Sequence, residues 1–326
     1  MVQRYGIVEG KIVPGAEPTL VTLFVAPDEG ERRTLTADYA LDPHDLASAL
    51  DPDELGRVDS VDDATTIILK TPRNYSSEDQ LLFTVTSMGL FLLPRGLVVV
   101  TTDPVDLFDD RIIRNVADIR DAILKILYGT IAHFLGHLKV INMLSDSLEQ
   151  RVSASMGNRY LLDMFTLEKS LVYFINGIGS NQMVLDKIRA NIARFKLTEA
   201  QHAVFDDIVI ENQQCSRQAE IYSNILTGLM DARGSVVNNN LNILIKRLTI
   251  ISVIFMPMNV LAGMGGMSEF SAWTRDIPWP IAYGSYLIFL IGVGTATWWV
   301  LKKLGIERNE LERRGRRKRN GDESPR

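Results

Sequence analysis

The chain has little cysteine: Cys215 is the only one among its 326 residues. A single cysteine cannot close an intramolecular disulfide or supply a cysteine framework for zinc, which is consistent with a reducing compartment. Residues 1–10 also lack a basic start followed by an apolar run, so they do not resemble a secretory signal or a transit peptide. We therefore expect membrane insertion to come from later segments.

Common catalytic sequence patterns are missing as well. The chain has no Gly-x-Ser-x-Gly, no His-Glu-x-x-His and no glycine loop followed by Lys-Ser/Thr. His133 and His137 have the spacing of zinc ligands on a helix, but no third ligand of a suitable type lies nearby in sequence, which favours packing or solvent-facing roles. The sequence predicts neither an enzyme nor a resident cofactor.

Two long runs without charge are present near the C-terminal end, at residues 248–267 and 281–301. Each is long enough to cross about 30 Å of hydrocarbon as a helix. Trp279, Trp298 and Trp299 stand at the ends of the second run, as in the aromatic belts of membrane proteins. A pair of buried core helices fits these features less well, so we predict two transmembrane helices.

Basic residues lie next to both runs on the same side. Lys246 and Arg247 precede the first run, and Lys302 and Lys303 follow the second. The positive-inside rule then places both termini in the cytoplasm. The tail, residues 302–326, is basic, and its segment from Arg313 to Arg319 is expected to contact anionic lipid headgroups rather than nucleic acid.

The residues before the membrane predict a cytoplasmic α/β domain followed by helices. Strand-like runs separated by Asp, Pro and Gly lie at 19–25, 65–70, 81–86 and 97–102, with a helical stretch at 44–56. Asp103-Pro104 is typical of a helix start, and helical spacing then continues with breaks near 157, at 177–181 and before 198. The predicted organisation is an α/β domain at 1–103, a helical stalk at 104–247, a first span at 248–267, an external loop at 268–280, a second span at 281–301 and a tail at 302–326.

The last predicted helix before the membrane is very long. Thr198 followed by Gln201 forms a capping-box pattern at its start. No strong stop signal follows, so the helix is expected to continue from about residue 199 to 256, into the first span. Such a helix needs lateral support, either from the preceding helices or from the same helix in other subunits.

A polar stripe runs along this helix into the first span. Thr249, Ser252 and Asn259 fall within an arc of about 80° on a helical wheel. The same face continues backwards through Asn242, Asn238, Ser235 and Asp231. Helix–helix hydrogen bonding explains single Ser or Thr residues in a span, but a stripe of this length favours a water-filled pore shared by several subunits.

Apolar residues on or beside the stripe are expected to narrow such a pore. They are Ile245, Leu248 and Met256. Rings of apolar side chains can gate a pore by dewetting. Because two spans per chain cannot enclose a pore, the sequence predicts a homo-oligomer.

Several short motifs in residues 242–267 resemble the pore helix of the CorA superfamily of magnesium channels. They are Lys246, Leu248 and Thr249 at the start of the span, the Ile-Phe-Met-Pro element at 254–257, and Ala262-Gly263. The resemblance covers the last third of the chain closely. It implies an intracellular α/β domain, two spans and a pentameric funnel.

The family signature is Gly-Met-Asn at the outer end of this helix, and here the matching triplet is Gly266-Met267-Ser268. In the family, the Asn ring and nearby carbonyls hold a hydrated cation. Ser268 has no amide carbonyl, whereas Glu269 next to it adds a carboxylate that would concentrate cations. The resemblance therefore implies a selectivity loop of changed chemistry at these four residues.

Further positions match family members along the long helix. The resemblance implies pore-lining roles for Asp231 and Asn242, and a regulatory metal ligand at Asp207. A partner for Asp207 is not identified, although Asp59, Asp62, Asp63, Asp109 and Asp110 are candidates in the N-terminal part.

The chemistry of the stripe suits partly hydrated divalent cations. No His or Cys lies between 231 and 280, so a tight transition-metal site in the pore is not expected. Magnesium, cobalt, nickel and zinc all stay open as substrates. The leading hypothesis, which follows the resemblance, is a homopentameric divalent-cation channel in a bacterial-type inner membrane; the alternatives are a proton-coupled zinc transporter and a non-conducting, metal-sensing membrane scaffold.

Overall fold

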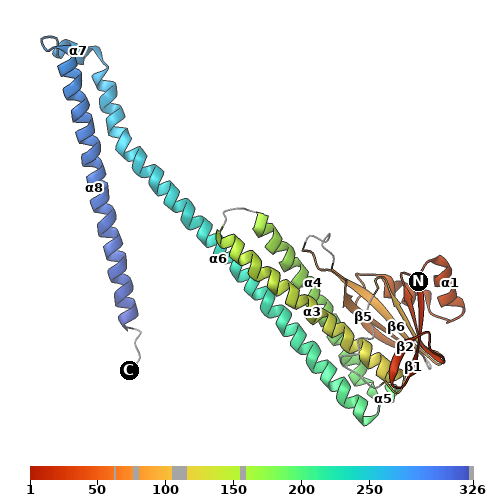
Figure 1. Ribbon diagram of the computed structural model, residues 1–326. Helices are drawn as coiled ribbons and strands as arrows, with labels where there is room; N and C mark the ends of the chain where they lie inside the picture. The colour runs from red at the N-terminus through yellow and green to blue at the C-terminus, as the bar shows by residue number, and fades with distance from the viewer. Residues whose placement is uncertain (62–63, 76–80, 105–115, 155–158, 323–326) are drawn as a thin grey trace. The chain divides into compact units, whose positions relative to one another are not determined.

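The computed structural model describes residues 1–61, 64–75, 81–104, 116–154 and 159–322, with side chains for all of these except 151–154, 269–271 and 304–322. The chain divides into two compact units, Met1–Asp231 and Ala232–Arg326. The first contains the sheet and most of the helices that pack on it, and the second contains the candidate membrane spans (Figure 1).

One seven-stranded sheet forms the base of the first unit. Its strands are β1 (Val2–Val8), β2 (Lys11–Pro14), β3 (Thr19–Val25), β4 (Arg57–Val61), β5 (Ala64–Pro72), β6 (Val85–Leu93) and β7 (Gly96–Thr101). They lie in the order β2-β1-β3-β7-β6-β5-β4. Only the central β3–β7 pair is parallel, with Leu23 opposite Val99. The predicted strands at 19–25, 65–70 and 97–102 are confirmed to within a residue or two.

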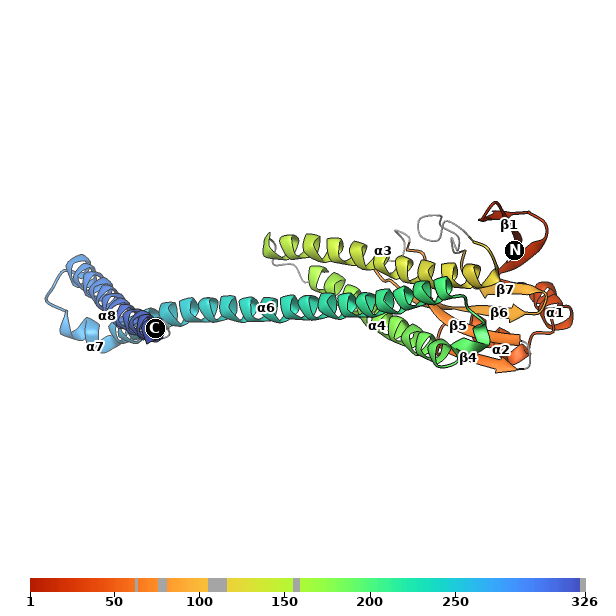
Figure 2. The same cartoon turned by 90° about the horizontal axis from the view of Figure 1, so that it is seen from below.

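Helices cover both faces of the sheet, so its central strands are apolar on both sides. Ile67 and Leu69 of β5 point into the larger core beneath α3 (Ile119–Ala154) and α4 (Arg159–Ala190). Ile68, between them, points to the other face. There it packs with Leu35 of α1 (Glu29–Ala37) and Leu46 of α2 (Pro43–Leu50). Figure 2 shows α3 and α4 on the side of the sheet away from α1 and α2.

The predicted strand at 81–86 is wrong in its first half, because β6 begins only at Val85. Phe83 is 1% exposed, and its N–H donates to the Ser170 hydroxyl of α4 at 2.9 Å. Phe83 therefore packs its ring against the helices. The hydroxyl of Ser170, in place of a neighbouring strand, accepts the hydrogen bond from its backbone N–H. Local β propensity did not distinguish this arrangement from a strand.

The predicted helix break at 177–181 is also wrong, because α4 is continuous from Arg159 to Ala190. Gly177 allows a close helix–sheet contact: a Cβ there would lie 3.1 Å from Val85 and 3.5 Å from the Cβ of Lys70. Asn181 accepts from the Lys70 N–H at 2.8 Å and donates to the Lys70 carbonyl at 2.7 Å. Both residues serve packing against β5 and do not end the helix.

The helix start expected at Asp103-Pro104 concerns residues 105–115, and the break near 157 concerns residues 155–158, all of which lie outside the described ranges; the next described helix, α3, begins at Ile119. The break before Thr198 is confirmed. The short α5 (Ile192–Phe195) is followed by Lys196, which caps it with φ 49°. The Thr198–Gln201 capping box then forms, with hydrogen bonds of 3.0 and 3.3 Å, and opens α6 (Glu199–Gly265).

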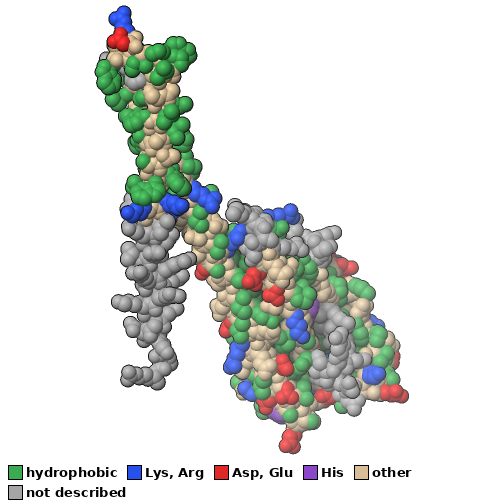
Figure 3. Space-filling view, turned by 60° about the vertical axis from the view of Figure 1, so that its left-hand side comes forward, with side chains coloured by type: hydrophobic (Ala, Val, Ile, Leu, Met, Phe, Trp, Pro, Cys, Tyr) green, Lys and Arg blue, Asp and Glu red, His purple; other side chains and the backbone are tan. Residues whose placement is uncertain are grey.

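The second unit consists of the later part of α6, the short α7 (Ser268–Trp273) and α8 (Trp279–Asp322). Two segments are long and apolar enough to cross a membrane, and both are almost wholly exposed within the chain. Figure 3 shows green apolar side chains along these segments with tan atoms between them, basic side chains gathered at the lower end of the apolar stretch, and basic and acidic side chains at its upper end. Apolar surface of this extent requires a lipid or protein environment.

Candidate functional site

Specific contacts join α6 and α8 within the second unit. The hydroxyl of Tyr286 on α8 donates to the backbone carbonyl of Leu261 on α6. Gly265 lies against the Tyr286 ring, and a Cβ added to Gly294 of α8 would lie 2.9 Å from the sulfur of Met258. Because glycine has no side chain, α6 and α8 can pack closely at these two positions, as is common between membrane helices.

These contacts define which side of α6 is covered. Counting about 100° per residue from Thr249, the α8-facing residues Met258, Leu261 and Gly265 lie at about 120–180°. The predicted pore residues lie between about 280° and 40°, on the opposite side of the helix. Within one chain, α8 therefore leaves the polar stripe uncovered.

Each predicted pore residue is exposed in the single chain. In the second unit they are Ser235, Asn238, Asn242, Ile245, Thr249, Ser252, Met256 and Asn259, and Asp231 is the last residue of the first unit. Met256 is 71% exposed and Ile245 is 59% exposed. The Thr249 hydroxyl donates to the Ile245 carbonyl at 2.8 Å, so this hydroxyl has a partner even without water.

The predicted selectivity loop lies where α6 ends. The Gly266 N–H donates to the carbonyls of Ala262 and Gly263, both at 3.2 Å, and the Met267 N–H donates to Met264 at 3.2 Å. Ser268 is exposed and begins α7. The backbone of Glu269 belongs to α7, but its side chain lies outside the described residues.

Asp207, the predicted regulatory metal ligand, lies exposed on α6 in the first unit. Burial raises the pKa of Tyr128 on α3, and the charges of Glu211 and Asp207 raise it further. Across the described part of the chain, no three His, Cys, Asp or Glu side chains group closely enough to hold a metal. A metal at Asp207 stays a prediction.

Of the partners considered for Asp207, Asp59 is the one that the structure describes. Its carboxylate pairs with Arg57 at 3.2 Å and Lys187 at 3.4 Å. Asp62, Asp63, Asp109 and Asp110 lie outside the described residues.

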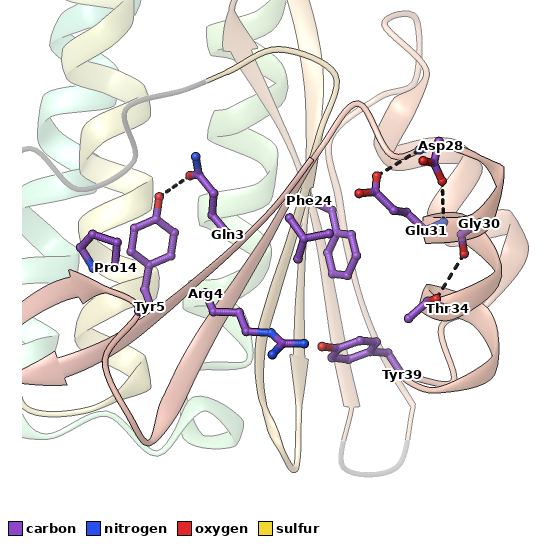
Figure 4. A pocket seen from close by; sticks show the side chains of 12 residues that line it. Gln3, Arg4, Tyr5, Pro14, Phe24, Asp28, Gly30, Glu31, Thr34 and Tyr39 are labelled. Carbon is purple, nitrogen blue, oxygen red and sulfur yellow. Dashed lines mark hydrogen bonds between the residues drawn. The ribbon is translucent and has the colours of Figure 1, made fainter.

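A cleft of about 940 Å³ lies between β1 and α1 (Figure 4). Arg4 points toward the hydroxyl of Tyr39, and Phe24 lies between the strand and the helix. The carboxylates of Asp28 and Glu31 form the capping box of α1, with hydrogen bonds of 2.8 and 3.1 Å. These acids serve the helix start, and we assign no function to the cleft.

Two features of the site were missed or undervalued at the level of sequence. Tyr286 was not singled out, although Gly265 and Gly294 are the small residues that close helix packing uses. His133 and His137 were interpreted as packing or solvent-facing residues, and their direct contact, with Nε2 atoms 2.9 Å apart, was not predicted.

The sheet, the long helix and the two candidate spans define a membrane protein with a large α/β extramembrane unit. A family model described as "CorA-like Mg2+ transporter protein" matches residues 23–303, and the chain belongs to this family. Its members are ion transporters and not enzymes.

Individual relatives agree with the family. The chain is 24% identical over 252 residues to the cobalt/magnesium transport protein CorA of Methanocaldococcus jannaschii, covering 74% of this chain and 77% of that protein. The complete structure of the CorA magnesium transporter of the same organism matches with a TM-score of 0.76 at 20% identity, over 92% of this chain and 96% of the other. The full-length CmaX protein matches with a TM-score of 0.67 at 15% identity, over 93% and 97%. Both structures show a shared fold.

Proposed function

We propose that this protein conducts divalent metal cations across the membrane through a pore on the axis of a homopentamer, lined by the polar stripe of α6. The observation that most supports this proposal is that α8 packs on the side of α6 opposite the stripe, through Tyr286 and Leu261. In a single chain surrounded by lipid, the part of the stripe inside the span, from Thr249 to Asn259, would face hydrocarbon.

A single chain surrounded by lipid would be unfavourable in free energy. An amide such as Asn259 in a hydrocarbon environment loses its hydrogen bonds to water, which costs several kcal/mol. Symmetry copies of α6 around an axis would place Asn242, Thr249, Ser252 and Asn259 in water and leave α8 toward lipid. The same geometry removes this cost at Ser252 and Asn259; Asn242 precedes the span, and the Thr249 hydroxyl already donates to the Ile245 carbonyl.

We propose magnesium and cobalt as the first candidate ions, because the similar protein of Methanocaldococcus jannaschii carries these two in its name. Nickel and zinc are included because Ser268 replaces the amide of the family signature and because hydroxyl, amide and carboxylate groups select weakly among hydrated ions. Gly266, Met267, Ser268 and Glu269 would form the outer mouth.

The proposed orientation places both termini in the cytoplasm of a cell with an inner membrane. Lys246 and Arg247 precede one span and Lys302 and Lys303 follow the other. The ammonium of Lys302 lies 5.0 Å from the ring centre of Trp298, and that of Lys303 lies 5.7 Å from Trp299. Such Trp–Lys pairs suit the headgroup region, where anionic lipid would be the partner.

Purified protein in liposomes tests the proposal directly. We expect uptake of magnesium or cobalt, driven by a concentration gradient, above that of empty vesicles and of vesicles with heat-denatured protein. Absence of flux for magnesium, cobalt, nickel and zinc would leave the scaffold alternative. A dependence of zinc uptake on an imposed pH gradient would favour the proton-coupled alternative.

The channel is preferred over proton coupling for a physical reason. Residues 248–268 contain no Asp, Glu, His or Lys. Proton-coupled transport through a span generally uses a titratable side chain at membrane depth. The stripe offers hydroxyls and amides, which conduct hydrated ions without exchanging protons at neutral pH.

A further inference from the structure

Two histidines of the first unit lie closer together than their spacing alone requires. His133 and His137 are on successive turns of α3, and their Nε2 atoms are 2.9 Å apart. Their ring centres are 4.7 Å apart with the planes tilted by 47°. Both reactive nitrogens therefore point at the same small volume.

Aromatic side chains hold one of the two rings in place. The ring centre of His137 lies 5.5 Å from that of Phe83 and 6.1 Å from that of Phe174 on α4, and both pairs are T-shaped. Phe83 is in turn stacked on Tyr75 at 4.3 Å. Both phenylalanines are at most 1% exposed, so this wall is part of the core and restricts rotation of the imidazole. The two histidines themselves are only half-buried.

We propose that His133 and His137 form a two-imidazole binding site for a divalent cation of the zinc, nickel or cobalt type. Imidazole nitrogen is a preferred ligand of these metals, whereas magnesium prefers oxygen and keeps its waters. This site goes beyond the conduction pathway: it uses no residue of the stripe, and its occupancy does not depend on transport.

The observed distance is close to what coordination needs. Two nitrogens each about 2.0–2.1 Å from a tetrahedral zinc are about 3.3 Å apart. The rings have to separate by only a few tenths of an ångström, which small side-chain rotations supply. Because the two residues are four apart on one helix, both can chelate one ion without a change in the backbone.

Metal binding to the pair requires no net gain or loss of protons. In the metal-free pair, one neutral imidazole donates its Nε2–H to the lone pair of the other. On binding, the donor exchanges to the tautomer that carries its proton on Nδ1, so both Nε2 lone pairs face the metal. No net proton is released. Water completes the coordination shell, since no third His, Cys, Asp or Glu of the described chain joins the pair.

Calorimetric titration of the full-length protein in detergent, after removal of metals with a chelator, tests the site. We expect zinc and nickel to bind and magnesium at the same concentrations not to compete. His133→Gln and His137→Gln should each weaken zinc binding by roughly tenfold or more, as loss of a ligand should cost at least as much as loss of a second-shell partner. His202→Gln, on α6, is the matched control and should bind as the unchanged protein does.

Two further measurements make the outcome decisive. X-ray absorption of the zinc-loaded protein should show two imidazole ligands, a signature that a merely structural role of the pair would not give. Asn259→Leu, expected to block conduction, should bind zinc normally, so failure of this site and failure of the channel proposal are distinguishable. Equal zinc binding in the unchanged protein and both histidine variants would overturn the proposal, as would a zinc spectrum without imidazole.

Discussion

The hydroxyl of Tyr286 donates to the carbonyl of Leu261, and this contact orients the two candidate spans. Because Leu261 lies on one side of α6, the side carrying Asn259 faces away from α8. The pairing of the spans thus explains why α8 does not cover the stripe residues inside the span, such as Ser252 and Asn259. A matching surface has to come from water, lipid or other copies of the protein, and only the first and the last suit amides.

Close packing of α6 against α8 can be tested with two glycines of α8. Gly294→Val should destabilise the second unit by about 1–3 kcal/mol, because the new side chain overlaps Met258. Gly292→Val is the matched control, since a Cβ there meets nothing within 4 Å. Thermal unfolding in detergent checks both. Equal stability of the two variants would contradict the observed packing.

Conduction should depend on the stripe and not on the opposite faces of α6. Asn242→Leu and Asn259→Leu should each reduce divalent-cation flux into liposomes by at least about tenfold, because apolar rings impede a hydrated ion. Ile251→Leu is the control, as Ile251 lies at about 200° on the wheel, outside the stripe. A scaffold would tolerate all three changes equally.

The signature triplet offers a test of selectivity. Ser268→Asn restores the amide that the resemblance associates with a hydrated cation at the pore mouth. Competitive uptake from a mixture of magnesium, cobalt, nickel and zinc should then shift toward magnesium. An unchanged ratio would show that Ser268 does not select among the ions. Ser271→Asn, a nearby change outside the triplet, is the control.

Asn181 should contribute strongly to the stability of the first unit. β4 pairs with β5 only as far as Ile68, so the backbone of Lys70 has no strand on that side, and Asn181 supplies both hydrogen bonds. Asn181→Leu leaves two buried backbone groups unpaired and should cost about 2–4 kcal/mol. Asn142→Leu, on the half-exposed face of α3, should cost far less. Circular dichroism during heating measures the difference.

Acid should destabilise the first unit of the metal-free protein. Burial lowers the pKa of His133 and, together with the charge of His133, lowers the pKa of His137 to about 4. In the unfolded chain both have a pKa of about 6.5 and take up protons first. The stabilising contribution is therefore present above about pH 6.5 and is lost as the pH falls toward 4.

The measurement is the melting temperature between pH 7 and pH 4 in the presence of a chelator. His137→Gln should flatten the dependence, because glutamine does not titrate. A dependence of equal steepness in this variant would assign the acid sensitivity to other groups.

Much of the architecture follows from local patterns in the sequence. Two charge-free runs long enough for a bilayer predict spans wherever they stand, because length and hydropathy act independently of the fold. The Thr198–Gln201 capping box predicts a helix start because its hydrogen bonds join residues three apart. The α/β class and the family resemblance likewise rest on short segments, and the structure and the family match agree with them.

Long-range contacts explain where sequence reasoning failed. Gly177 and Asn181 have the composition of a helix break, yet they lie mid-helix because β5 is directly against them. Phe83 has the local character of a strand residue but is held by Ser170, 87 positions away. No local pattern contains those partners, so tertiary packing overrode propensity at both places.

The sequence alone determined that the protein has two membrane-type segments and a polar stripe on one of them, because helix period and residue polarity are local properties. Only the tertiary structure decided which side of α6 is covered by α8, and that His133 and His137 turn their Nε2 atoms toward each other. The first depends on where Tyr286 packs, and the second depends on where Phe174 packs. Both side chains are distant in sequence from the residues they contact. Packing at such distances is set by the whole fold and not by the period of one helix.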